Sequence, residues 1–477
     1  MTGRSAKGFR ESSGVFFGDG FRDANPVAIA IGLTVGRPTP VEGPRRDRSR
    51  PAGHPRPAAP GPHRGPVTPH LKSRSGRGGS FAVQRLVLLE VAAALLVCGW
   101  IAGMYVMIPA AVVAAVLLVL AVVRRRGRSL PEWLGTLLAL RARTRRAAAT
   151  AVPPGTDSGL VPAVECDPTL RTYSYSRGDD RDQRPVGMVG DGGFLTAVLQ
   201  VESDAGALRA ERGRRPLPVA LVRDVLEVDG IRLESAQIVV HTQPAPALHL
   251  PQQSVVVSNY APLQAQTGSP AVRIIWIALK LDPELCPEAV AARGGGLVGA
   301  QKCLARAAEH LASRLTGAGF RANILNEEEL TAAIATSVCA NPMVTAQAAQ
   351  AGRGEAQQRR TEESSRSWRC DNRRHTTYWI RRWPQLGGDG TSLAQLVAQL
   401  TSVPALATTF SLTLTEGGRQ DVSVTGHLRI TGRSNQELTD ARRELERTAR
   451  AAKTGLARLD REQLPGVLAT LPLGGAR

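Results

Sequence analysis

The chain has 477 residues, of which 43% are hydrophobic and only 4% aromatic, and its formal net charge is +19. The positive charge is concentrated, because residues 44–146 hold 18 lysines and arginines against three acidic residues. So few aromatic side chains exclude the stacking surfaces that bind single-stranded nucleic acid. The charge pattern instead predicts anionic lipid as a partner, and no nucleic acid.

Residues 1–80 are rich in proline, glycine, serine and arginine and show no apolar periodicity. This composition predicts a disordered basic tail. A translation start placed too early would explain the segment equally well.

Two apolar runs follow, Leu86–Gly103 and Met107–Val123. As helices they would be roughly 25 to 27 Å long, close to the roughly 30 Å of a hydrocarbon core. The sequence therefore predicts a hairpin of two transmembrane helices within residues 81–123. Arginines at both ends predict a multi-pass protein of the inner cell membrane with both termini in the cytoplasm. A buried helical hairpin in a soluble protein is the alternative interpretation.

The charged residues beside these runs are candidate contacts with lipid or partner subunits. Glu90 lies about one turn inside the first run, where it either reaches the headgroups or pairs with a neighbouring subunit. Four arginines follow the second run: Arg124, Arg125, Arg126 and Arg128.

Residues 124–146 are predicted to form a basic amphipathic helix next to the membrane. Trp133 and Leu137 fall on its apolar stripe, and Arg141 and Arg145 lie near its end. Such a helix lies in the membrane interface, or it docks its apolar stripe onto the soluble domain or a partner helix. The two interpretations are compatible.

A linker at 147–160 leads to a cytosolic domain predicted over residues 161–455. Strand-like and helix-like segments alternate there, which predicts an α/β (α+β) domain with a mixed sheet. The run Ala271–Leu281 is apolar enough to be a central strand. Residues 341–365 are predicted to be a polar insertion, and residues 456–477 a C-terminal tail.

Neither a cofactor nor a metal is expected. The sequence has no phosphate loop, no HExxH and no GxSxG motif, and its six cysteines form no CxxC pair. Asp180 and Asp182 have the spacing with which some sugar-nucleotide enzymes hold a metal, but arginines surround them. A solvated charge cluster is therefore the favoured interpretation, and no catalytic residue is assigned.

Several phrases, taken in their order along the chain, resemble a known family: Leu130-Pro-Glu-Trp133, Gly187–Phe194, Leu250-Pro-Gln-Gln253 and Trp276–Leu281. They resemble the E component (EccE-like) of actinobacterial type VII, or ESX, secretion systems over roughly residues 80–430. The resemblance implies a structural subunit of a membrane core complex. Its partners would be the B, C and D components, of which C is the ATPase.

The sequence is therefore compatible with two functions. The favoured one is a non-catalytic, membrane-anchored subunit that stabilises the export machinery. The alternative is a membrane-tethered, glycosyltransferase-like enzyme that uses a sugar nucleotide, with Asp180 and Asp182 in a pocket at the carboxyl edge of a sheet.

Overall fold

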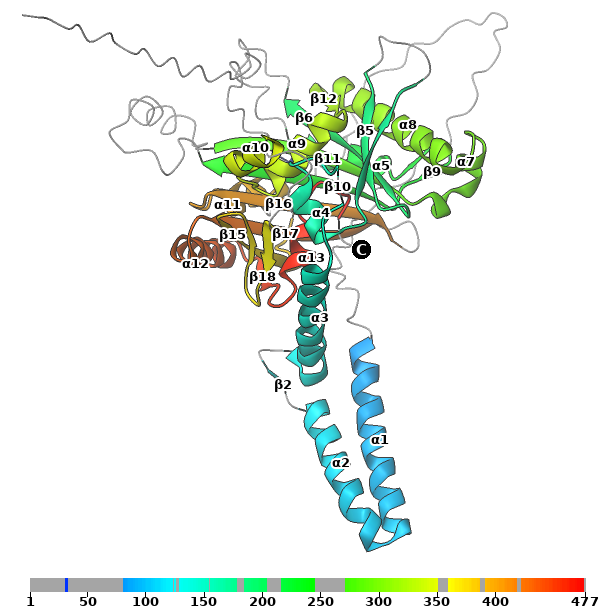
Figure 1. The fold of residues 1–477 in the computed structure, drawn as a ribbon, viewed down its shortest axis with the longest axis vertical. Helices are drawn as coiled ribbons and strands as arrows, with labels where there is room; N and C mark the ends of the chain where they lie inside the picture. Colours follow the sequence, from blue (N-terminus) through cyan, green and yellow to red (C-terminus); the bar gives the residue numbers. More distant parts are fainter. Residues whose placement is uncertain are drawn as a thin grey trace, which may run out of the picture.

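In the computed structural model, a broad sheet domain carries a stalk of helices (Figure 1). The described residues are 31–32, 80–122, 124–125, 128–153, 155–177, 184–203, 216–244, 271–350, 359–386, 391–417 and 422–475. Outside these residues lie the motif Leu250-Pro-Gln-Gln253, Asp180 and Asp182, and most of the expected tail 1–80.

The stalk begins with two helices packed along each other, α1 (Ser80–Ala102) and α2 (Met104–Val122). The turn between them is Gly103, whose φ of +96° suits glycine. Close packing explains a second glycine, because a Cβ added at Gly99 would lie 3.0 Å from the Cβ of Ala110. Most other described side chains of the pair are exposed.

The predicted two-helix transmembrane hairpin is wrong. Among the described residues, no helix combines the length and the apolar character that a membrane crossing requires. The multi-pass topology with both termini in the cytoplasm depended on those spans and loses its support.

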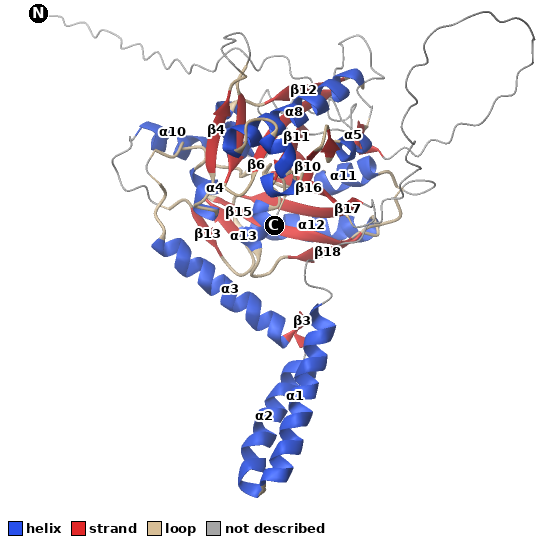
Figure 2. Cartoon of the chain, turned by 90° about the vertical axis from the view of Figure 1, so that its right-hand side faces the viewer, coloured by secondary structure: helices blue, strands red, loops and turns tan. Residues whose placement is uncertain are grey.

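A short hairpin of β2 (Arg124–Arg125) and β3 (Arg128–Ser129) joins α2 to α3 (Leu130–Ala149). α3 leaves the stalk obliquely and reaches one end of the sheet domain (Figure 2).

The domain is built on one twelve-stranded sheet, and all strand pairs recorded in it are antiparallel. Its first half contains, in chain order, α4 (Val161–Cys166), β4 (Arg171–Tyr175), β5 (Val186–Gly190), β6 (Leu195–Ser203), α5 (Val219–Asp224), β10 (Ser235–Pro244), β11 (Ala271–Leu281), α8 (Gly296–Gly317), β12 (Phe320–Ile324) and α9 (Glu327–Ser337). The second half contains α10 (Pro342–Gln350), β13 (Thr361–Glu363), β14 (Trp368–Cys370), β15 (Arg373–Arg382), α11 (Leu393–Thr401), β16 (Ala407–Glu416), β17 (Val422–Gly432), α12 (Asn435–Ala451), β18 (Gly455–Arg458) and α13 (Gln463–Leu468).

The two halves repeat one topology. Each is a three-stranded meander whose last strand opens a βαββαβ unit. In the first unit the spatial order is β12–β6–β11–β10, and in the second it is β18–β15–β17–β16. The strands β10 and β16 pair with each other and join the halves into one sheet.

This topology corrects the predicted mixed sheet. The helix α8 crosses from β11 to β12, which are parallel, but β6 lies between them and pairs antiparallel with both. The helix α11 connects β15 to β16 around β17 in the same way. Alternating strands and helices therefore produce an antiparallel sheet here, because every crossover skips one strand.

Several short elements lie outside the twelve-stranded sheet. They are β1 (Ile31–Gly32), which pairs in parallel with β7 (Leu217–Pro218), the hairpin of β8 (Glu227–Val228) and β9 (Ile231–Arg232), the 3-10 turn Pro283–Leu285 and α7 (Pro287–Ala291).

Helices cover both faces of the sheet. On the first face α5, α7, α8, α11 and α12 enclose the larger hydrophobic core. On the second face α4, α9 and α13 enclose a smaller core around the buried rings of Trp276 and Trp368. A row of polar side chains crosses the second face near the junction of the halves, and it includes His241, Arg429 and His375.

The last described residues, 469–475, cross the second face as a strap over the junction. Gln237 of β10 and Ser411 of β16 both donate to the Ala469 carbonyl, at 2.9 and 2.8 Å. Thr196 of β6 donates to the Leu473 carbonyl at 3.1 Å. The segment assigned to a tail thus contains β18, α13 and this strap, with Leu471 and Leu473 in the core.

Candidate functional site

The candidate functional site is the place where α3 docks on the sheet domain, between the stalk and β13 (Figure 2). One face of α3 is half-buried there, with Trp133, Leu137, Leu140, Arg143 and Ala147 along it. The spacing of these residues follows the 3.6-residue period of a helix, so they form a single stripe.

A two-pronged ion pair holds the middle of α3. The Nε and Nη2 atoms of Arg143 donate to the two carboxylate oxygens of Glu363, at 2.9 and 3.0 Å. Only 3% of the Glu363 side chain is exposed, and its Oε1 also accepts from the backbone N–H of Leu464 at 3.0 Å. Such paired, largely desolvated hydrogen bonds fix orientation as well as position.

Arg461 contacts the docked stripe at two points, Trp133 and Arg143. Its carbonyl accepts from Arg143 Nη2 at 2.6 Å, and its guanidinium lies 4.6 Å from the ring centroid of Trp133. Its φ of +65° is uncommon for a residue with a side chain, and its N–H is held by the Ser365 carbonyl at 2.7 Å. The cation–π contact and the hydrogen bond therefore depend on one fixed loop conformation.

Arg359 closes the carboxyl end of α3. Its Nη1 donates to the Ala147 carbonyl at 2.5 Å and its Nη2 to the Glu165 carbonyl in α4 at 2.9 Å. A cation at the last turn of a helix satisfies carbonyls that have no helical partner and interacts favourably with the helix dipole.

The adjacent Arg360 anchors this edge inside the domain. Its Nε and Nη2 donate to the two carboxylate oxygens of Asp371, each at 2.8 Å, and both side chains are at most 4% exposed. Burial alone would raise the pKa of Asp371, but the hydrogen bonds from Arg360 and from the Asn341 N–H lower it below the usual value of an aspartate. The buried Glu165 carboxylate accepts from the backbone N–H groups of Arg360 and Thr361.

A cavity of about 200 Å³ lies between the end of α3 and α4. Arg146, Cys166 and Asp167 are among its lining residues. Burial and the neighbouring Glu165 carboxylate raise the pKa of the Cys166 thiol, so it stays protonated and is a poor nucleophile. Nothing in this cavity supports covalent chemistry.

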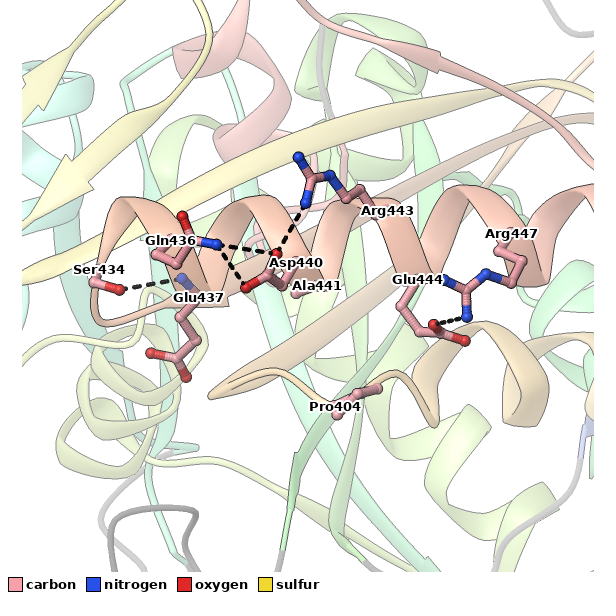
Figure 3. A pocket seen from close by; sticks show the side chains of 9 residues that line it. All are labelled: Pro404, Ser434, Gln436, Glu437, Asp440, Ala441, Arg443, Glu444 and Arg447. Carbon is pink, nitrogen blue, oxygen red and sulfur yellow. Dashed lines mark hydrogen bonds and ion pairs between the residues drawn. The ribbon is translucent and has the colours of Figure 1, made fainter.

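A wider groove runs along α12 beside Pro404 (Figure 3). Its charged side chains pair along the helix itself: Asp440 accepts from Gln436 and Arg443, and Glu444 pairs with Arg447. They do not converge on one point, as the groups of a catalytic site would. In the described part of the chain, no cluster of three or more possible ligands could hold a metal ion.

The contact candidates named from the sequence separate into three groups. Trp133 and Leu137 belong to the docked stripe, whereas Glu90, Arg141 and Arg145 are exposed. Four arginines precede α3: Arg124 and Arg125 form β2, Arg128 lies in β3, and Arg126 lies outside the described residues. Their side chains are not described, so their role stays a prediction.

No pattern in the sequence pointed to the residues that receive α3. Arg359, Glu363 and Arg461 lie more than 200 residues from α3 along the chain. Arg359 and Glu363 also fall in the segment taken for a polar insertion. Only the apolar stripe of α3 pointed to a docking surface, and a stripe does not identify its partner.

A double-mutant cycle should detect the coupling between α3 and β13. Glu363→Ala alone is expected to cost about 2 to 3 kcal/mol, because it leaves Arg143 and the Leu464 N–H without their acceptor. The double variant with Arg143→Ala should cost clearly less than the sum of the single variants. Urea unfolding of the full chain measures all three, and strict additivity would contradict direct coupling.

Comparison with known protein families gives a match to one segment of the chain. Residues 269–380 match the model of a family described as "Putative type VII ESX secretion system translocon, EccE". The match extends from β11 into β15, and it includes Arg359, Arg360 and Glu363 but not α3. No curated protein matches the chain.

Proposed function

We propose that the chain is an EccE-like component of a type VII ESX secretion translocon, and that it acts there as a non-catalytic structural subunit. In this proposal it stabilises the inner-membrane export machinery by holding its sheet domain in a fixed orientation to its partners. Those partners are the B, D and ATPase C components, together with anionic lipid.

The observation that carries the proposal is the docking of α3. An Arg143–Glu363 pair, an Arg461–Trp133 contact and the Arg359 cap all connect the helix to a domain edge within or next to the matched segment. A helix fixed at several points transmits position from the stalk to the domain, as a scaffold requires.

The stalk offers the surface that partners would cover. At the tip of the α1–α2 pair, Trp100, Ile101, Met104 and Tyr105 are 77% to 97% exposed. Contiguous apolar patches of this kind mark interaction sites, because leaving them in water is unfavourable. We propose that apolar segments of the other translocon subunits pack on this tip.

The enzymatic alternative gains no support. A sugar-nucleotide site of the expected kind needs a crevice at the carboxyl edge of parallel strands, and the sheet here is antiparallel. Asp180 and Asp182 lie outside the described residues.

Affinity purification of the tagged full-length chain from detergent extracts of its host tests the proposal. The ATPase and the other core components should be recovered with it. Glu363→Ala should lower their recovery several-fold, because α3 no longer fixes the domain relative to the stalk.

The matched control is Glu362→Ala, which removes the neighbouring carboxylate, whose side chain is 66% exposed and pairs with Arg369. It should leave recovery unchanged, since exposed ion pairs contribute little. Recovery of the wild-type chain alone, as a stable monomer, would overturn the proposal.

A further inference from the structure

The outer face of α3 is left uncovered by the docking. Leu134, Leu138, Arg141 and Arg145 are all exposed, with Leu138 at 61%. Their spacing of three to four residues places them on one stripe, rotated by roughly 100° or more about the helix axis from the docked face. We name these four residues the outer stripe.

The outer stripe has a polarity gradient along the helix. Its two leucines lie toward the stalk and its two arginines toward the sheet domain. Within the described part of the chain, the guanidinium groups of Arg141 and Arg145 make no ion pair, so both charges are available to a ligand.

The exposed surface of the stalk is apolar, but four arginines separate it from the outer stripe: Arg124, Arg125, Arg126 and Arg128. Along α2 the exposed side chains are apolar, among them Val112, Val116 and Val119, and α3 begins a few residues later. Along the chain the apolar stalk is therefore followed by the arginines at 124–128, then by Leu134 and Leu138, and then by Arg141 and Arg145. Exposed leucines beside exposed arginines on one helix fit an anionic lipid surface, because leucine side chains enter the acyl boundary and arginines bind the phosphates.

We propose that the outer stripe binds an anionic lipid surface, with Leu134 and Leu138 at the acyl boundary and Arg141 and Arg145 on lipid phosphates. The inference rests on the proposed function, because it assumes that the subunit works at a membrane. It also reassigns the lipid-facing residues: Trp133 and Leu137, the expected membrane stripe, face the domain instead.

Vesicle flotation of the purified full-length chain tests the inference. The probes are vesicles of phosphatidylcholine alone and vesicles with three parts in ten phosphatidylglycerol, because the ratio of the two affinities isolates the anionic contribution from apolar binding by the stalk. The double variant Arg141→Gln/Arg145→Gln should lower this ratio about 25-fold, at about five-fold per arginine near a charged surface. Leu134→Ser/Leu138→Ser should weaken binding to both kinds of vesicle.

The matched control is Arg443→Gln/Arg447→Gln on α12, which removes the same charge from another exposed helix. It should leave the ratio close to the wild-type value. An equal fall in both arginine variants would show that only net charge matters, and an unchanged ratio in the α3 variant would also overturn the inference.

The same preparations separate this inference from the proposed function. If the α3 variants float like the wild type but lose the partner subunits in affinity purification, the outer stripe binds protein and not lipid. If the wild-type chain recovers no partner, the scaffold function fails whatever the flotation shows.

Discussion

Replacing Arg360 by alanine is expected to lower the free energy of unfolding by about 3 to 5 kcal/mol, the cost of breaking a buried ion pair by removing one partner. The substitution leaves Asp371, whose side chain is 3% exposed, with little besides the Asn341 N–H to stabilise its charge. It also removes the donors to the Ser158 carbonyl and to Thr345. The chain segments around Ser158, Thr345 and Asp371 would lose the side chain that joins them.

Urea unfolding of the full chain, followed by tryptophan fluorescence, measures this loss. The matched control is Arg369→Ala, which breaks the exposed pair with Glu362 on the neighbouring strand and should cost under about 1 kcal/mol. The double variant Arg360→Met/Asp371→Leu should recover part of the loss, because it leaves no buried charge unpaired. Equal losses in Arg360→Ala and Arg369→Ala would contradict the assigned role.

Stability should also fall steeply as the pH drops below about 6.5. His241 and His375 are fully buried, and burial, followed by the charges of Arg429 and Arg373, lowers the pKa of both. The pKa of His241 falls to about 3. In the unfolded chain both imidazoles take up a proton near pH 6.5, whereas in the folded chain they remain neutral.

The sign of the effect follows from proton binding. Below pH 6.5 the unfolded state binds more protons than the folded state, so acid favours unfolding. Each histidine should cost about 2 kcal/mol between pH 6.5 and pH 5, and the loss continues toward pH 3. The stability is complete above pH 6.5 and does not fall again at mildly alkaline pH on account of these groups.

Urea midpoints at several pH values check this prediction. Burial also lowers the pKa of a third histidine, His427, to about 4. The variant His241→Gln should therefore reduce the slope of stability against pH by about a third, whatever it does to stability at pH 7. A slope that is unchanged in this variant would mean that other groups carry the acid sensitivity.

Local elements could be read from the sequence because their signals are local. The apolar run Ala271–Leu281 is β11 with the same bounds. Asn326 caps α9 through a reciprocal pair with Glu329. Each depends on residues within one turn or one strand, where periodicity and capping decide the outcome.

Strand order could not be read, because it depends on pairing between distant segments. The two halves have the same topology, but their central hairpins are closed by connections of very different length, 245–270 in one and 417–421 in the other. The sequence therefore shows no repeat of fixed length. The mixed-sheet prediction failed for the same reason, since alternation along the chain does not reveal the strand that each crossover skips.

The sequence predicted only one side of the docking site. The amphipathic character of α3 predicted a docked stripe but left open whether lipid, domain or partner covers it. The acceptor residues are charged and were read as a solvated insertion, although Arg360 and Thr361 are buried. Burial of charge follows from a partner elsewhere in the chain, and composition cannot report that partner.

The strap over the junction of the two halves has a consequence for biosynthesis. Residues 469–475 hydrogen-bond to β6, β10 and β16, strands made much earlier in translation. The sheet domain therefore cannot complete its fold until residues 469–475 have left the ribosome. The apolar helices α1 and α2 emerge long before that. The stalk is free to meet its neighbours while the rest of the polypeptide is still unfinished, so assembly can precede folding.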